Sequence, residues 1–166
     1  INILTFDDKV STLSPTSLPA TPEMLRKGNL FVDGMQGGGG TEMMNGIRAA
    51  MSAPVAAPRM RMVVFLTDGY VGNDQEILAE VANTVGEARL FSFGIGSSVN
   101  RYLLDGLASR GRGAVQYVLL NSKEMDAVEL FRKRLDSPML TDISLDWGGL
   151  DVRDLSVDTV PDIFAG

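Results

Sequence analysis

The feature that most constrains the fold is a regular alternation of apolar strand-like segments with helical segments, which continues to about Leu135. Such alternation is typical of a parallel sheet, because parallel strands need crossover connections and helices usually supply them. We therefore predict an α/β fold: a doubly wound, mostly parallel sheet with helices on both faces. The strands predicted in this region are Met62 to Leu66, Leu90 to Gly96 and Val115 to Leu120. The helices predicted between and after them are Asn73 to Gly86, Arg101 to Arg110 and Met125 to Leu135.

Both ends of the chain also carry sequence patterns typical of strands, and the first end carries a helix start. Ile1 to Phe6 alternates apolar and polar residues, and Val10 to Leu13 can return as the second arm of a hairpin. Thr21 followed by Pro22 is a typical helix start, with a capping residue and then proline at the first helical position. After Pro138 the chain alternates again, from Met139 to Trp147, which indicates a half-exposed strand.

Composition limits the classes of function. The 166 residues are enough for one domain with a core, and 45% of them are hydrophobic. The net charge is −6 and the basic residues are scattered, which argues against a nucleic-acid partner. The chain has no cysteine and no histidine, so thiolate or imidazole metal sites and histidine-based triads are excluded, and oxygen ligands remain. No apolar run approaches the roughly 20 residues of a membrane span.

Two short segments carry the candidate chemistry. The run Gly37 to Gly40 is followed by Thr41, where a helix is expected to begin and to continue until just before Pro54. Asp68 follows Met62 to Leu66, which we interpret as a central strand covered on both faces, and it therefore stands at the carboxyl edge of the sheet, where ligands bind in open α/β folds. Thr41 alone can be a helix cap, and Asp68 alone can belong to a turn. Together, a hydroxyl and a carboxylate on neighbouring loops predict a hard-cation site for which further loops must supply ligands.

Nucleotide binding and nucleophilic catalysis fit less well. The glycine run lacks the lysine of a phosphate-binding P-loop and follows a predicted helix rather than a strand. The segment Gly94 to Ser98 does follow a strand, but Val99 stands where a dinucleotide fingerprint needs its third glycine. The serines have no histidine to activate them. We therefore expect no enzymatic activity.

At this level of detail the chain resembles a von Willebrand factor type A domain, and within that family the inter-alpha-trypsin inhibitor heavy chain group. The matching segments occur in the expected order over nearly the whole chain. They are Phe6 to Val10, Gly38 to Glu42, Val64 to Gly69, Phe91 to Gly96 and Ser137 to Asp142, with Pro161 to Gly166 at the end.

The resemblance implies a Rossmann-like fold with a metal-ion-dependent adhesion site that binds Mg²⁺ or Mn²⁺ and an acidic group of a protein partner. Thr41 matches the second-loop threonine of that site, and Asp68 matches the third-loop aspartate. The first-loop motif, Asp-x-Ser-x-Ser, has no match in this sequence, and in the family it lies upstream of Ile1 together with the first strand. We expect another copy of the chain, by homo-oligomerisation or strand exchange, or an upstream segment, to fill the place of that strand.

These patterns lead to one set of expectations. Residues 1–137 should form a von Willebrand factor A-like domain without its first strand, and 138–166 a strand and tail leading to a following module. The expected function is non-catalytic, cation-dependent binding of a protein partner, with Thr41 and Asp68 as metal ligands. The alternative is a structural or assembly module of the same fold without a working metal site. The resemblance also suggests an exported or cell-surface bacterial parent protein.

Overall fold

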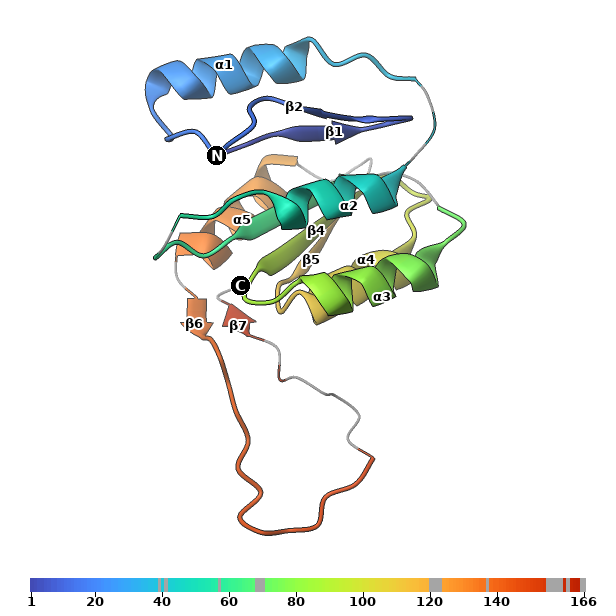
Figure 1. Ribbon diagram of the computed structural model, residues 1–166, viewed down its shortest axis with the longest axis vertical. Coiled ribbons are helices and arrows are strands. Elements are labelled where there is room, and N and C mark those ends of the chain that lie inside the picture. Colours follow the sequence, from blue (N-terminus) through green and yellow to red (C-terminus); the bar gives the residue numbers. More distant parts are fainter. Residues whose placement is uncertain are drawn as a thin grey trace. The chain divides into compact units, whose positions relative to one another are not determined.

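A computed structural model of the chain describes residues 1–38, 40, 42–56, 58–67, 71–119, 124–136, 138–154, 160 and 162–164. The chain divides into two compact units (Figure 1). The first unit contains Ile1–Arg61 and Val71–Ala88, and the second contains Met62–Tyr70 and Arg89–Gly166. Each unit is described by itself below.

The first unit combines a small hairpin with three helices. Its strands β1 (Leu4–Phe6) and β2 (Val10–Thr12) pair antiparallel, as the sequence predicts. Its helices are α1 (Pro22–Asp33), α2 (Met43–Ser52) and α3 (Asp74–Thr84). The predicted start of α1 is confirmed, because the Thr21 hydroxyl accepts a hydrogen bond of 3.3 Å from the amide of Met24 and Pro22 opens the helix.

Glycine allows close packing of α2 on the hairpin. A Cβ atom at Gly46 would lie 2.8 Å from ring atoms of Phe6, a distance that real Cβ contacts do not reach. On the opposite side α2 is joined to α3, since Arg48 Nε donates a 2.9 Å hydrogen bond to Glu80 Oε1. This pairing raises the pKa of Arg48 and lowers that of Glu80, in each case mainly through the hydrogen bond between the two side chains.

The second unit is built on a parallel sheet, which confirms the predicted fold class. Its strands β3 (Met62–Thr67), β4 (Arg89–Ile95) and β5 (Val115–Val118) lie in the order β3-β4-β5. Val64 is in register with Phe91, and Phe93 with Gln116. The helices of this unit are α4 (Arg101–Arg110) and α5 (Glu124–Asp136), and a second strand pair follows them, β6 (Pro138–Leu140) with β7 (Ile163–Phe164).

The two helices of this unit pack on opposite faces of the sheet. Helix α5 lies on the face of Phe91 and Phe93, whose rings meet the Phe131 ring edge-on with centroid distances of 5.3 and 5.1 Å. Side chains alternate between faces along a strand, so Gly94 belongs to the other face. There a Cβ atom at Gly94 would lie 2.7 Å from Leu104 of α4, so the glycine permits the close approach of this helix.

Three predictions about these elements need correction. Helix α2 was expected to begin at Thr41, but it begins at Met43 with Glu42 as its N-cap. Met62 to Leu66 was expected to be a central strand buried on both faces, but β3 is an edge of the described three-stranded sheet. Its alternate residues Met62, Val64 and Leu66 are 45%, 39% and 55% exposed, because α5 covers their face only over β4 and β5. The strand predicted over residues 139–147 is also too long. The described ladder there ends at Leu140, since β7 offers only two residues for pairing.

Candidate functional site

The two predicted metal ligands, Thr41 and Asp68, lie outside the described residues. Their neighbours in sequence belong to different units, Gly40 and Glu42 to the first and Thr67 to the second. The predictions made for these two side chains therefore remain predictions. The described residues lie on both sides of position 41 but only before position 68.

The turn between β1 and β2 holds the chain on both sides of residue 41. The Gly40 amide donates a 2.6 Å hydrogen bond to Asp8 Oδ1, and the Glu42 amide donates one of 3.0 Å to the Asp7 carbonyl oxygen. A Cβ atom at Gly40 would lie 3.0 Å from Asp8 Oδ1, so the contact suits glycine at this place. Sequence reasoning assigned Asp7 and Asp8 to a turn and missed this contact, because 32 residues separate Asp8 from Gly40.

Position 68 comes directly after the last residue of β3. The three parallel strands end at Thr67, Ile95 and Val118, which form the carboxyl edge of the sheet. After β4 the chain turns at Gly96, which has a φ of +102° and donates a 2.9 Å hydrogen bond to the Val118 carbonyl oxygen. This edge is the place where open α/β sheets bind ligands.

A cation site in this chain would use oxygen donors, since the sequence has no histidine or cysteine. Among the residues that the structure describes, no group of three or more Asp and Glu side chains is placed to hold a metal ion. The Asp8 carboxylate is in contact with a backbone amide, which suits a residue that positions a loop. A hydroxyl at 41 and a carboxylate at 68 fit the preference of Mg²⁺ for oxygen ligands, and water completes such sites.

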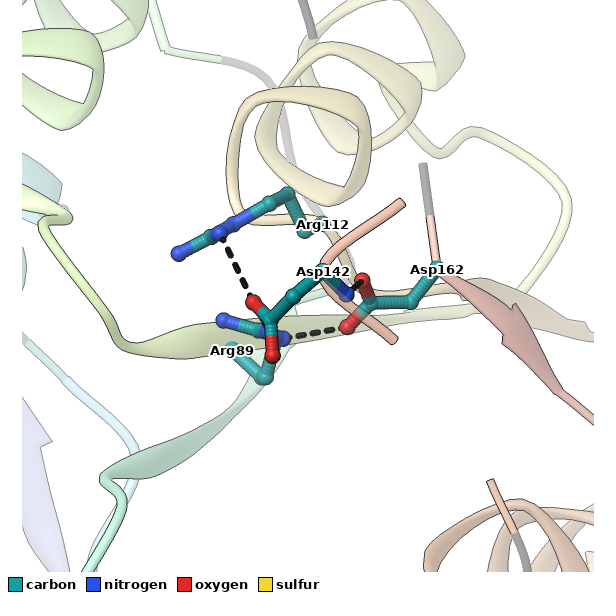
Figure 2. A network of polar contacts seen from close by, with 4 residues as sticks. All are labelled: Arg89, Arg112, Asp142 and Asp162. Atoms are coloured by element: carbon teal, nitrogen blue, oxygen red, sulfur yellow. Dashed lines mark hydrogen bonds and ion pairs between the residues drawn. The ribbon is translucent and has the colours of Figure 1, made fainter. Parts of the chain in front are cut away.

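A polar cluster that was not predicted from the sequence joins Asp162, just before β7, to Arg89 at the start of β4 (Figure 2). Arg89 Nε donates a hydrogen bond to Asp162 Oδ2, and Arg89 Nη2 donates one of 2.8 Å to Asp142 Oδ1. Arg112 Nη1 lies 3.4 Å from the same Asp142 oxygen, and the Asp142 amide donates a 3.2 Å hydrogen bond to Asp162 Oδ1. Burial alone would lower the pKa of Arg89, but its bonds to the two carboxylates raise the pKa above its ordinary value.

Another polar cluster surrounds Tyr117 of β5. Its hydroxyl donates a 2.6 Å hydrogen bond to Asp105 Oδ1, and the Arg101 guanidinium lies 4.0 Å from the centre of its ring. Burial, with the hydrogen bond to Asp105 as a second cause, raises the pKa of Tyr117 to about 12. The phenol is therefore protonated at neutral pH and holds α4 against the sheet.

Comparisons with known proteins agree with the resemblance seen in the sequence. The family model of the von Willebrand factor type A domain matches residues 1–117. A von Willebrand factor A domain-containing protein of Dictyostelium discoideum is 29% identical over 150 residues, which are 90% of this chain and 16% of that protein. The human von Willebrand factor A domain-containing protein 5B1 is 27% identical over 147 residues, 88% of this chain and 12% of that protein. The chain thus spans less than a fifth of the length of these relatives.

Solved structures agree on the fold. A von Willebrand factor type A protein from Catenulispora acidiphila superposes with a TM-score of 0.66 at 18% identity, covering 79% of this chain and 32% of that one. The conserved hypothetical protein BatB from Bacteroides thetaiotaomicron gives a TM-score of 0.58 at 15% identity, covering 79% and 75%. No helix in the described parts of the chain combines the length and the apolar character that crossing a membrane requires. The chain belongs to the von Willebrand factor type A domain family, whose members are typically protein-interaction modules and generally non-catalytic.

Proposed function

We propose that this chain is a protein-binding module whose site uses a divalent cation, Mg²⁺ or Mn²⁺, to bind an acidic side chain of a partner. Thr41 and Asp68 are two of the cation's ligands in this proposal. The observation that carries it is the family match over residues 1–117, which includes both positions and their loops. The assignment to the heavy-chain group, with an Asp-x-Ser-x-Ser loop and a first strand upstream of Ile1, belongs to the same proposal.

The described neighbours of both positions support this assignment. Asp8 and Asp7 hold Gly40 and Glu42, the residues before and after position 41. Residue 68 directly follows β3 at the carboxyl edge of the parallel sheet. A cation with only a few protein ligands keeps coordination positions for water, and a partner carboxylate can replace one of those waters. With no histidine or cysteine in the chain, oxygen atoms are the donors available to it.

The test is a calorimetric titration of Mn²⁺ into the chain, beside Thr41→Ala and Asp68→Ala. We expect heat that saturates at about one ion per chain and an affinity that falls about a hundredfold in either variant. The matched control is Asp151→Ala, which removes an exposed carboxylate paired with Arg153 and should leave the titration unchanged.

The same titration is repeated on a chain extended upstream, because the remaining ligands are proposed to lie there. Saturable heat in the extended chain alone supports the site and assigns its completion to the upstream loop. No saturable heat in either chain refutes the proposal and leaves the alternative, a structural or assembly module of this fold without a metal site.

A further inference from the structure

The second unit has an open apolar groove on the face of the sheet that carries α5. It has a volume of about 280 Å³ and is lined by Val64, Leu66, Phe93, Ile95, Val128 and Phe131, among others. All of its lining side chains are apolar. Small-molecule sites usually have roughly 300–1,000 Å³ and a few polar groups that orient the ligand. A small groove with an apolar lining is suited to one or two inserted side chains of a polypeptide.

The same unit carries an exposed apolar segment between β6 and β7, residues 143–154, here called the arm. Its four large apolar side chains are well exposed: Leu145 56%, Trp147 42%, Leu150 72% and Val152 37%. The described residues of the arm form no strand ladder. An apolar surface of this kind on a projecting segment is typical of an interaction site.

The tip of the arm has the geometry of a hairpin turn. The Leu150 amide donates a 3.0 Å hydrogen bond to the Trp147 carbonyl oxygen, and Gly148 and Gly149 between them have φ values of +59° and +89°. These are the φ values of a type I′ turn, the turn that best suits two-residue hairpins. The Gly148 amide also donates a 2.9 Å hydrogen bond to Asp146 Oδ1, which supports the turn.

This turn determines which side chains of the arm share a face. In a hairpin with a two-residue turn, residues directly opposite each other point to the same side. In the described arm the only backbone hydrogen bond between its two sides is the one at the turn, between Leu150 and Trp147. An isolated two-stranded hairpin is marginally stable, so the arm would continue this pairing only on an apolar surface. Leu145 would then be opposite Val152, with all four apolar side chains on one face and Ser144, Asp146, Asp151 and Arg153 on the other.

The arm leads away from the groove of its own unit. Arg89 begins β4 and holds Asp142 at the base of the arm, whereas Ile95 of the groove ends the same strand. Figure 1 shows the chain leading away from the sheet after β6. To reach its own groove the arm would have to reverse at Asp142, whose carboxylate is held by both Arg89 and Arg112.

We propose that the arm of one copy docks its apolar face in the groove of a second copy, and that the exchange is reciprocal. The groove and the arm are both apolar and both exposed in one chain, so a two-fold dimer removes both surfaces from water. Stable interfaces bury roughly 1,200 Å² or more, and a two-fold dimer makes the contact between arm and groove twice. The proposal is independent of the cation site.

Analytical ultracentrifugation over a range of concentrations tests it, with Trp147 as a reporter because it is the only tryptophan. We expect a monomer–dimer equilibrium in which dimerisation shifts Trp147 emission to shorter wavelength. Leu150→Asp in the arm and Leu66→Asp in the groove should each weaken dimerisation about tenfold or more. Leu30→Asp, at an exposed apolar residue of α1 in the first unit, is the matched control and should leave the equilibrium unchanged. Circular dichroism checks that all variants are folded.

A mixing experiment separates reciprocal exchange from other dimers. Leu150→Asp keeps a functional groove and Leu66→Asp keeps a functional arm, so a mixture of the two should form a heterodimer more strongly than either forms a homodimer. A chain that stays monomeric at its highest soluble concentration overturns the proposal. So does a dimer that neither variant weakens, and so does a blue-shifted Trp147 emission that is independent of concentration, which would indicate docking of the arm within one chain.

Discussion

Arg89 and Asp162 form an ion pair whose side chains are only 3% and 0% exposed, although 73 residues separate them in the chain. Asp142 and Arg112 extend this pair toward the surface. The cluster joins the first residue of β4 to the residue just before β7. Since the base of the arm is attached at the same place, this cluster orients the arm with respect to the sheet.

Replacing Asp162 by alanine removes the buried carboxylate that pairs with the buried guanidinium of Arg89. Removing one partner of a buried ion pair typically costs about 3 kcal/mol or more, so the free energy of unfolding should fall by about that amount. Urea denaturation followed by circular dichroism measures the change. Asp151→Ala, which breaks the exposed pair with Arg153, should change the stability by less than about 1 kcal/mol. Equal effects of the two variants would show that the buried pair has no special role.

Gly113 lies against the backbone of β4, and a Cβ atom there would be 2.1 Å from the Leu90 carbonyl oxygen. Because a strand backbone cannot move away easily, Gly113→Ala should destabilise the protein by about 2 kcal/mol. Gly72→Ala is the control, since a Cβ atom at Gly72 meets nothing within 4 Å. Thermal denaturation of the two variants should show a lower melting temperature for Gly113→Ala alone.

Tyr117 should make stability depend on pH in the alkaline range. Its pKa is raised to about 12 in the folded protein, against about 10 in an unfolded chain. Below about pH 10 both states keep the proton, and between about pH 10 and 12 only the folded state keeps it, so the free energy of unfolding falls as pH rises through this window. Tyr117→Phe should flatten this fall, whereas Tyr102→Phe, at an exposed tyrosine, should retain it. Phenolate absorbance during a pH titration would refute the assignment if all the tyrosines ionised near pH 10.

Asp8 should influence cation binding without being a ligand, because its carboxylate accepts the hydrogen bond from the Gly40 amide. Asp8→Ala removes that acceptor and should weaken Mn²⁺ binding about tenfold, a typical effect of a residue that orients a ligand. Asp8→Asn keeps an oxygen acceptor and should retain most of the affinity. Asp33→Ala, an exposed acid at the end of α1, is the control. A loss with Asp8→Asn as large as with Asp8→Ala would instead identify the carboxylate as a direct ligand.

Local patterns allowed most elements to be predicted from the sequence. Helix α4 has the predicted bounds, Arg101–Arg110, because Gly111 ends it and its apolar residues Leu103, Leu104 and Leu107 are all buried on one side. The start of α1 was also predicted, since capping depends on residues three positions apart. Parallel pairing followed from the order of strands and helices.

Contacts between distant residues could not be predicted. No local signal relates Arg89 to Asp162 or Asp8 to Gly40, because both pairs meet only after the chain has folded. The apolar pattern of β3 was interpreted as burial on both faces, yet such a pattern does not show whether another element covers each face. The alternation after Pro138 was recognised, but a strand ladder also needs a partner of sufficient length, and β7 is short.

The ion pair at the base of the arm also bears on the order of events in folding. Arg89 belongs to a strand that can pair with β3 and β5 through contacts closer along the chain, whereas Asp162 arrives 73 residues later. Until its carboxylate partners in the later part of the chain arrive, burying the guanidinium is costly, so we expect the first end of β4 to stay hydrated while the rest of the strand becomes ordered. Closing so long a segment is entropically unfavourable and slow. The attachment of the arm is therefore a late step, and during synthesis the sheet can form before the arm is attached to it.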